Sequence, residues 1–256
     1  MGLYCHKKFI LTRRWSLWLV GPEERVSLPR RIGRDVGCFV AEMAFEVAKF
    51  LAIAVFVFLF LTQCTAIKAS AATTIPRGAE QYRALLIRTA HATWGLEAPI
   101  AVFAAQVHTE SRWNTNAQSP VGAVGLAQFM PATAKWMPQV DPALAGPAPT
   151  NPGWALRGLA SYNLWLWQRV QGENDFERMA FVLSAYNGGL GWVQRDKTLA
   201  KQKGLNPKRW FTSVETVNAG RSKASFTENR NYPRLILQER QHAYVQAGWG
   251  RGVPRE

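Results

Sequence analysis

Glu110 is the residue whose type and position are best suited to acid–base chemistry. It follows the range Pro99–His108, in which apolar residues recur at the i, i+3, i+4, i+7 spacing of a helix that buries one face. A carboxyl group just past the end of such a helix can lie in a cleft wall with little solvent, where burial favours the neutral acid and raises its pKa. A proton donor at neutral pH needs that state. A glutamate at a helix end is more commonly a solvated surface residue, so the surrounding sequence has to support the chemistry.

The segment 119–131 is the second candidate, because two glycines stand three residues apart at Gly122 and Gly125. Glycine allows a positive φ and a close backbone approach, so we expect a tight loop or small hairpin here and no helix. Gln128 emerges from this loop beside apolar residues. An amide in apolar surroundings needs hydrogen-bond partners, and the hydroxyl and acetamido groups of a sugar could supply them.

Tyr186 and Asn187 stand at the end of a helix predicted over 176–186, because the glycines that follow them are typical stop signals. Side chains at that place either face a cleft or serve the fold, with Asn187 capping the helix and the Tyr186 ring packed in the core. The sequence leaves both readings open.

A second carboxylate near Glu110 would indicate a glycosidase with two acidic residues, which is the usual arrangement. No Asp or Glu occurs from 111 to 140. Asp175 or Glu228 could still approach Glu110 in space, and the sequence alone does not exclude either.

Helical patterns dominate the part of the chain that must position these residues. We expect helices over 79–94, 99–108, 133–137, 156–170, 176–186 and 233–246, with a proline-rich connector over 146–152. No run of alternating residues and no repeat of 20–50 residues is present. The predicted fold class is therefore all-α, in one domain over 72–256.

An apolar run of twelve residues from Phe50 to Leu61 precedes this domain. A bilayer span needs about 20 apolar residues and a secretory core about 7–15, so the run resembles a secretory core. Small residues at Ala69 and Ala71 suit a signal peptidase. We expect an export segment over 50–71, cleaved near Ala71 or retained as a membrane anchor, which places the domain in the periplasm. Residues 1–49 form a basic N-terminal region that is long for a leader, and Met43 is an alternative start.

The formal net charge of +14 points to a polyanionic partner or to a generally basic surface. Nucleic acid is disfavoured, because the aromatic residues are not interleaved with a basic stripe and an export segment points away from DNA. The three cysteines all lie in the first quarter of the chain, which excludes a disulfide framework or a cysteine metal cluster in the domain. His91 and His108 lack companions, so we expect no metal site and no cofactor.

Five tryptophans could stack on sugar rings: Trp154, Trp165, Trp167, Trp192 and Trp210. For those on the helix over 156–170, packing in the core is favoured. The basic stretch Arg195–Arg209 is expected to be a solvated face that could also contact an acidic wall polymer.

Three blocks of residues together resemble the soluble lytic transglycosylase family, over about Ala79 to Tyr232. The blocks are Glu110-Ser111-x-Trp113-Asn114, Ser119-Pro120-x-Gly122-Ala123-x-Gly125-Leu126-x-Gln128-x-Met130-Pro131 and Ala185-Tyr186-Asn187-x-Gly189. The resemblance implies a lysozyme-like fold related to goose-type lysozyme. It also implies cleavage of the β-1,4 bond between N-acetylmuramic acid and N-acetylglucosamine in the glycan strands of peptidoglycan.

The resemblance also assigns roles to individual residues. Glu110 matches the single catalytic acid/base of the family, which closes a 1,6-anhydro ring on the muramoyl residue and needs no second carboxylate. The positions that match its saccharide cleft are Ser119, Gln128, Met130, Tyr186 and Asn187, with Glu228 and Tyr232 in a looser late Glu…Tyr element.

Several alternatives and departures remain at this point. The same fold could host a muramidase that adds water, or an inactive module that binds the wall or takes part in assembly, for example in a secretion or conjugation apparatus. The middle-helix motif of the family is altered over 151–159, which puts its packing in doubt. The stretch 193–226 shows no familiar motif and is expected to set substrate or partner preference.

Overall fold

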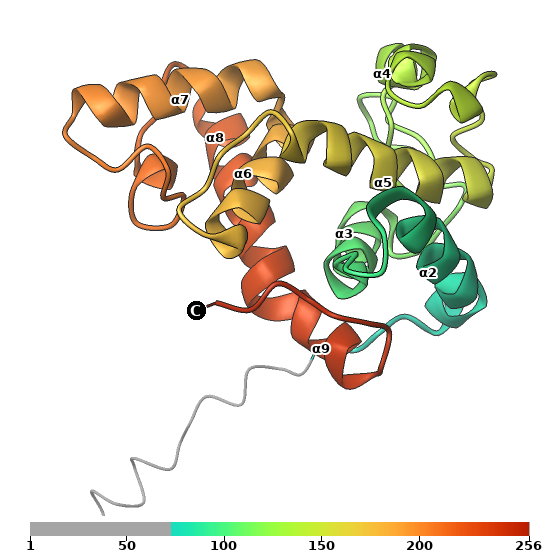
Figure 1. Ribbon diagram of the computed structural model, residues 1–256. Coiled ribbons are helices and arrows are strands. Elements are labelled where there is room, and N and C mark those ends of the chain that lie inside the picture. Colours follow the sequence, from blue (N-terminus) through green and yellow to red (C-terminus); the bar gives the residue numbers. More distant parts are fainter. Residues whose placement is uncertain (1–72, 256) are drawn as a thin grey trace, which may run out of the picture. The chain divides into compact units, whose positions relative to one another are not determined.

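The computed structural model describes residues 73–255, and the regular structure in this range is helical (Figure 1). The only β-type pairings among these residues are isolated bridges, Gln118 with Val124 and Val124 with Phe129. The predicted all-α class is therefore confirmed for the described part. The expected export segment 50–71, the region 1–49 and the three cysteines lie outside the described residues.

The helices follow one another without strands between them. The α-helices are α2 (Glu80–Trp94), α3 (Ile100–Ser111), α4 (Pro131–Trp136), α5 (Pro152–Trp167), α6 (Asp175–Gly188), α7 (Leu190–Gln202), α8 (Lys223–Arg234) and α9 (Gln241–Gln246). Short 3-10 turns are η1 (Arg77–Ala79), η2 (Met137–Gln139), η3 (Pro142–Leu144) and η4 (Val214–Thr216), and η5 (Leu235–Arg240) is a π-helical turn.

Helix α3 is the central element of the core. Every side chain from Ile100 to His108 is buried, so α3 is enclosed on all sides and the expectation of a single buried face was too narrow. It packs against α2, α9 and η5. Because α3 is packed against several other elements, its last turn is a well-supported place from which to present a functional side chain.

Helix α5 joins the two halves of the helical assembly, since it packs against α2 on one side and α6 on the other (Figure 1). Its altered motif has a clear structural role. The Asn151 side chain caps the helix by accepting a hydrogen bond of 3.0 Å from the Trp154 backbone N–H. A Cβ at Gly158 would lie 2.9 Å from the Phe129 ring, so this glycine permits close contact between α5 and the loop 119–131.

The C-terminal helices differ from the expectation. The predicted helix over 233–246 was placed too late, because Pro233 lies inside α8 near its end and the π-helical turn η5 follows directly. The true start is marked by Ser222, whose hydroxyl accepts a hydrogen bond of 3.2 Å from the Ser225 N–H. A proline removes one hydrogen bond from a helix interior, and π turns accommodate such interruptions. Helix α7 was not predicted at all.

The buried apolar side chains of residues 73–255 form one connected core. Among these residues, no helix combines the length and the hydropathy that crossing a membrane requires.

Candidate active site

A cavity of about 740 Å³ opens between α3, the loop 119–131, α6 and α8. All eight predicted site residues line it: Glu110, Ser119, Gln128, Met130, Tyr186, Asn187, Glu228 and Tyr232. The fold thus brings together side chains from four separate segments of the chain.

Glu110 lies in the last turn of α3 and not beyond it, because the helix runs three residues further than predicted, to Ser111. The helix then ends at Arg112 and Trp113, which both take a positive φ of 52° and 66°. Burial raises the pKa of the Glu110 carboxyl group from 4.5 to about 7, and the charge of Glu228 adds to the rise. Glu110 can therefore hold a proton close to neutral pH.

Tyr232 on α8 supplies the direct partner of this carboxyl group. Its hydroxyl donates a hydrogen bond to Glu110 Oε1. A donor to a carboxylate favours the charged form, so this contact works against burial and lowers the pKa of Glu110. The pKa of Tyr232 is itself raised well above its usual value, first by burial and then by the Glu110 charge, so its hydroxyl remains a donor.

Of the two acidic residues that could approach Glu110, Glu228 lines the same cavity and Asp175 does not. Asp175 begins α6, whereas the cavity lies at the opposite end of that helix, at Tyr186 and Asn187. Glu228 is exposed at the cavity edge and accepts a hydrogen bond of 3.2 Å from Asn187 Nδ2.

The loop 119–131 forms one wall and is held by its own polar groups. Gly122 and Gly125 take the expected positive φ, 90° and 81°, and a Cβ at Gly125 would lie 1.8 Å from the Pro149 carbonyl oxygen. Ser119 Oγ accepts a hydrogen bond of 2.9 Å from the Ala123 N–H. The expectation of a tight loop is confirmed.

Gln128 finds partners inside this loop that we had expected a sugar to supply. Its Nε2 donates to the Gly125 and Ala117 carbonyl oxygens, at 2.9 and 3.1 Å. The backbone of Gln128 has a φ of 48°. The side chain still lines the cavity, but its amide nitrogen is engaged in holding the loop.

Three aromatic side chains from α6, α5 and the loop 119–131 line another part of the cavity. The Tyr186 hydroxyl donates to the Ala127 carbonyl oxygen at 2.8 Å. Its ring centroid lies 5.3 Å from that of Tyr162 and 6.0 Å from that of Phe129. Tyr162 on α5 lines the cavity, and the sequence analysis missed it because its helix was interpreted only through its apolar stripe.

Other lining residues were also missed by the sequence analysis. They are Thr109, Val121, Ala123, Phe129, Thr133, Gly189, Asn231 and Leu235. Thr109 and Asn231 directly precede Glu110 and Tyr232 in the sequence. Their position next to predicted site residues is the signal that could have identified them.

A buried amide pair lies behind the acid. Asn163 Nδ2 on α5 donates to Gln106 Oε1 on α3 at 2.6 Å, and both side chains are fully buried. Gln106 lies one turn before Glu110 on the same helix. Its side chain lowers the pKa of Tyr232, against the larger effects of burial and of the Glu110 charge that raise it. The sequence pattern predicted that Gln106 lies in a helix, but it gave no indication that its side chain is buried next to Asn163.

None of the five tryptophans lines this cavity. Trp154 on α5 is buried in the core, as expected for the middle helix, and Trp210, which lies outside α5, is buried as well. Trp165 and Trp167 on α5 are covered by guanidinium groups, Arg169 at 3.8 Å and Arg178 at 4.2 Å from the ring centroids. The aromatic side chains that line the cavity are instead those of Tyr162, Tyr186, Tyr232 and Phe129.

His108 packs in the core and does not line the cavity. His108 is buried edge-on against Tyr244, and burial together with Arg240 and Arg112 lowers its pKa to about 4. Within residues 73–255, no group of three His, Cys, Asp or Glu side chains could hold a metal ion.

The basic stretch Arg195–Arg209 is only partly a solvated face. Lys197 Nζ donates to the Gln171 carbonyl oxygen at 2.8 Å and lies over the Phe181 ring, and Arg209 pairs with Glu173 at 2.8 Å. Lysines 201, 203 and 208 are exposed.

Comparison with known proteins identifies a family whose model matches the part of the sequence that carries most of these residues. The model of the transglycosylase SLT domain family matches residues 86–210, a range that contains α3, the loop 119–131 and α6. Glu228 and Tyr232 lie beyond the matched range. Together with the helical architecture of residues 73–255, this match confirms the expected lysozyme-like fold.

Individual relatives carry related names. A membrane-bound lytic murein transglycosylase F from Shewanella halifaxensis is 37% identical over 108 residues, which cover 42% of this chain and 21% of that protein. The protein of the same name from Pasteurella multocida is 28% identical over 152 residues, which cover 59% and 26%. This chain thus spans only about a quarter or less of the length of these relatives.

Among solved structures, the 70 kDa soluble lytic transglycosylase from Escherichia coli is 25% identical, with a TM-score of 0.47 over 65% of this chain and 24% of that one. The sequence blocks around Glu110, Gln128 and Tyr186 all fall within the range that the family model matches. Residues 86–210 of this chain therefore match the family of transglycosylase SLT domains.

Proposed function

We propose that this protein is a lytic transglycosylase that cleaves the β-1,4 bond between N-acetylmuramic acid and N-acetylglucosamine in peptidoglycan strands. The observation that carries the proposal is the carboxyl group of Glu110, which is half-buried at the wall of a large cavity and has its pKa raised to about 7. The match of residues 86–210 to the transglycosylase SLT domain and the names of the relatives support the same reaction class.

The proposed reaction uses Glu110 twice. The protonated carboxyl group first donates its proton to the glycosidic oxygen. The bond from that oxygen to C1 of the muramoyl residue breaks, the N-acetylglucosamine part leaves with a free hydroxyl, and the 2-acetamido carbonyl of the substrate stabilises the anomeric carbon. The resulting carboxylate then removes the proton from the muramoyl C6 hydroxyl, which attacks C1 and closes the 1,6-anhydro ring. A pKa near the working pH suits a group that must serve as acid and then as base.

Neighbouring residues assist each step in this proposal. Tyr232 steadies the carboxylate by donating to Oε1. Tyr186, Gln128, Ser119 and Met130 line the cavity where the sugar rings would bind. An attacking hydroxyl that belongs to the substrate gains the entropic advantage of an intramolecular reaction.

A hydrolytic muramidase is the second candidate, because Glu228 lines the same cavity as Glu110 and could activate a water molecule. The exposed position of Glu228 and its hydrogen bond from Asn187 favour a role at the cleft edge. An inactive wall-binding or assembly module is disfavoured, because a carboxyl group in a cavity wall with its pKa raised to about 7 is typical of a site that transfers protons.

The proposed setting is the periplasm, reached through the expected export segment 50–71, which is either cleaved or kept as an anchor. Membrane-bound relatives agree with this setting. Service to a secretion or conjugation apparatus that must cross the wall remains a prediction.

The decisive test is Glu110→Gln in the full chain, assayed on purified sacculi. We expect the variant to fold and to lose activity by several orders of magnitude, because glutamine cannot donate the proton. Glu239→Gln, an exposed change on η5, is the matched control and should leave activity intact.

Mass spectrometry of the products separates the two candidate reactions. Anhydro ends are lighter than reducing ends by one water, so reducing ends in the wild-type digest would establish the muramidase. Full activity of Glu110→Gln would refute both mechanisms.

A further inference from the structure

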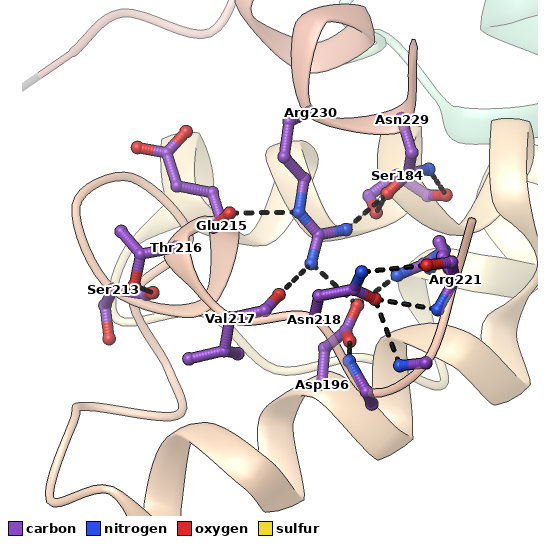
Figure 2. A network of polar contacts seen from close by, with 12 residues as sticks. Ser184, Asp196, Ser213, Glu215, Thr216, Val217, Asn218, Arg221, Asn229 and Arg230 are labelled. Carbon is purple, nitrogen blue, oxygen red and sulfur yellow. Dashed lines mark hydrogen bonds and ion pairs between the residues drawn. The ribbon is translucent and has the colours of Figure 1, made fainter. Parts of the chain in front are cut away.

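A buried ion cluster joins helix α7 to α8 and to the segment just before α8 (Figure 2). Asp196 on α7 is fully buried and accepts hydrogen bonds from two buried guanidinium groups, Arg221 Nη1 and Arg230 Nη2, the second at 2.9 Å. Arg230 also donates to the Glu215 and Val217 carbonyl oxygens, at 3.0 and 2.6 Å. Buried charges with so many fixed partners do not reorient without a large penalty, so Arg230 is a rigid reference point.

This rigid arginine fixes which way the Asn229 side chain points. Arg230 Nη1 lies 2.7 Å from one side-chain atom of Asn229, and an arginine can only donate, so that atom must be the oxygen Oδ1. The other atom lies 2.8 Å from the Ser184 carbonyl oxygen, which can only accept, so it must be the nitrogen Nδ2. The Ser184 hydroxyl also donates to Oδ1, at 2.9 Å.

The direction of Asn229 then fixes that of Asn187, which lines the cavity. Asn229 Nδ2 lies 3.0 Å from Asn187, so the facing atom of Asn187 must be its acceptor Oδ1. The nitrogen of Asn187 is thereby turned toward Glu228, to which it donates at 3.2 Å. An Asn187 amide in the opposite direction would place its oxygen against a carboxylate.

We propose that Asn229 is a positioning residue that fixes the direction of the Asn187 amide, so that the cleft always presents an N–H donor and an anchored Glu228 carboxylate to the bound strand. The inference rests on the proposed function, because the strand is the ligand of that cleft. The second Asn187 N–H is the group that would meet a carbonyl or hydroxyl oxygen of the strand. Helix α7, which was absent from the sequence prediction, acts on the cleft through Asp196 in this way.

The test compares two losses from the same network in the full chain. Asn229→Ala removes the amide that orients Asn187, whereas Ser184→Ala removes one donor to Asn229 and leaves both its Arg230 and its Asn187 contacts. Both variants lose a buried hydrogen bond, so both should melt at a lower temperature than wild type. On soluble glycan strands, only Asn229→Ala should raise KM, by about three- to tenfold for one hydrogen bond, with kcat little changed.

Asn229→Ser is a second variant for the case that Asn229→Ala does not fold. It keeps an oxygen near Arg230 but cannot reach Asn187, so it should raise KM as Asn229→Ala does.

A double-mutant cycle separates positioning from general loss of structure. In an Asn187→Ala background, Asn229→Ala should raise KM no further, because its effect passes through Asn187. Additive effects of the two changes, an unchanged KM in Asn229→Ala, or an equal rise in Ser184→Ala would each overturn the proposal.

A measurement without turnover keeps this inference distinct from the proposed function. The side-chain NH₂ signals of Asn187, followed by NMR, should have the same chemical shifts in wild type and Ser184→Ala and should shift or broaden in Asn229→Ala, where the amide loses its fixed direction. Identical Asn187 signals in all three proteins would refute the positioning role. If wild type neither cleaves nor binds strands, the proposed function fails and the NMR result alone decides the role of Asn229.

Discussion

The carboxyl group of Glu110 is subject to opposing influences from its neighbours. Burial raises its pKa, the hydrogen bond from Tyr232 lowers it, and the charge of Glu228 raises it, with a result of about 7. The neutral acid therefore predominates below about pH 7 and the carboxylate above it. Because the proposed reaction starts with the acid, kcat/KM should fall as the pH rises through this value.

Removal of the Tyr232 hydroxyl should shift the pH at which kcat/KM falls, which is the alkaline limb of the pH profile. In Tyr232→Phe the carboxylate loses the donor that stabilises it, so the pKa of Glu110 rises and the alkaline limb of kcat/KM shifts to higher pH. The rate itself should also fall, since the carboxylate formed in the first step is less well held. The measurement is a pH profile on soluble strands, with Tyr82→Phe, outside the cavity, as control. A limb that stays in place or moves to lower pH would contradict the assignment.

At the scale of elements, α3 and α5 meet through a polar pair in an otherwise apolar core. Gln106 and Asn163 are fully buried and bonded to each other at 2.6 Å, and Asn163 Oδ1 has no hydrogen-bond partner among the described residues. Each amide depends on the other, because an unpaired polar group in the core costs about 1–3 kcal/mol. The pair stands directly behind the turn that carries Glu110, so the stability of this contact also supports the site.

Replacement of the pair should show strong coupling. Gln106→Met and Asn163→Leu alone should each lower the free energy of unfolding by about 1–3 kcal/mol, because each leaves a buried amide unpaired. The double variant should lie closer to wild type than the sum of the two, since no unpaired amide remains. Urea unfolding of the four proteins measures this interaction energy. Strict additivity would mean that the two amides do not depend on each other.

At the scale of the whole molecule, positive charge is the main surface property. The range 73–256 holds 21 Lys and Arg against 12 Asp and Glu. Some of these cations are engaged, as Arg209 is with Glu173, but the lysines at 201, 203 and 208 are exposed. A surface of this kind attracts an acidic polymer over a distance limited by salt screening.

Binding to sacculi should therefore weaken as salt increases. Glu110→Gln protein allows binding to be measured without cleavage, and a Lys201→Glu/Lys203→Glu variant should bind less and depend less on salt. Arg77→Glu/Arg88→Glu carries the same charge change on exposed residues at the other end of the described range and is the matched control. Binding that ignores salt, or an equal loss in the control, would show that α7 has no special part in it.

Local patterns in the sequence determined the helical class, the tight loop at Gly122 and Gly125, and the motif around Glu110, because periodicity and backbone preference act between near neighbours. The start of α8 was missed, since Pro233 is typical of a helix start and the preceding residues are polar. Only the tertiary structure decided that Tyr232 donates to Glu110 and that Glu228 stands near it.

Contacts between residues far apart in the sequence were also decided only by the tertiary structure. The cap at Asn151 could be recognised locally, whereas the contact between Asp196 and Arg230 joins α7 to α8, which no spacing rule connects. The raised pKa of Glu110 could not be predicted from the sequence either. Burial and charge depend on every element packed around a group, so the sequence alone determined which acid is present, and the packing of α3, α6 and α8 decided when it holds its proton.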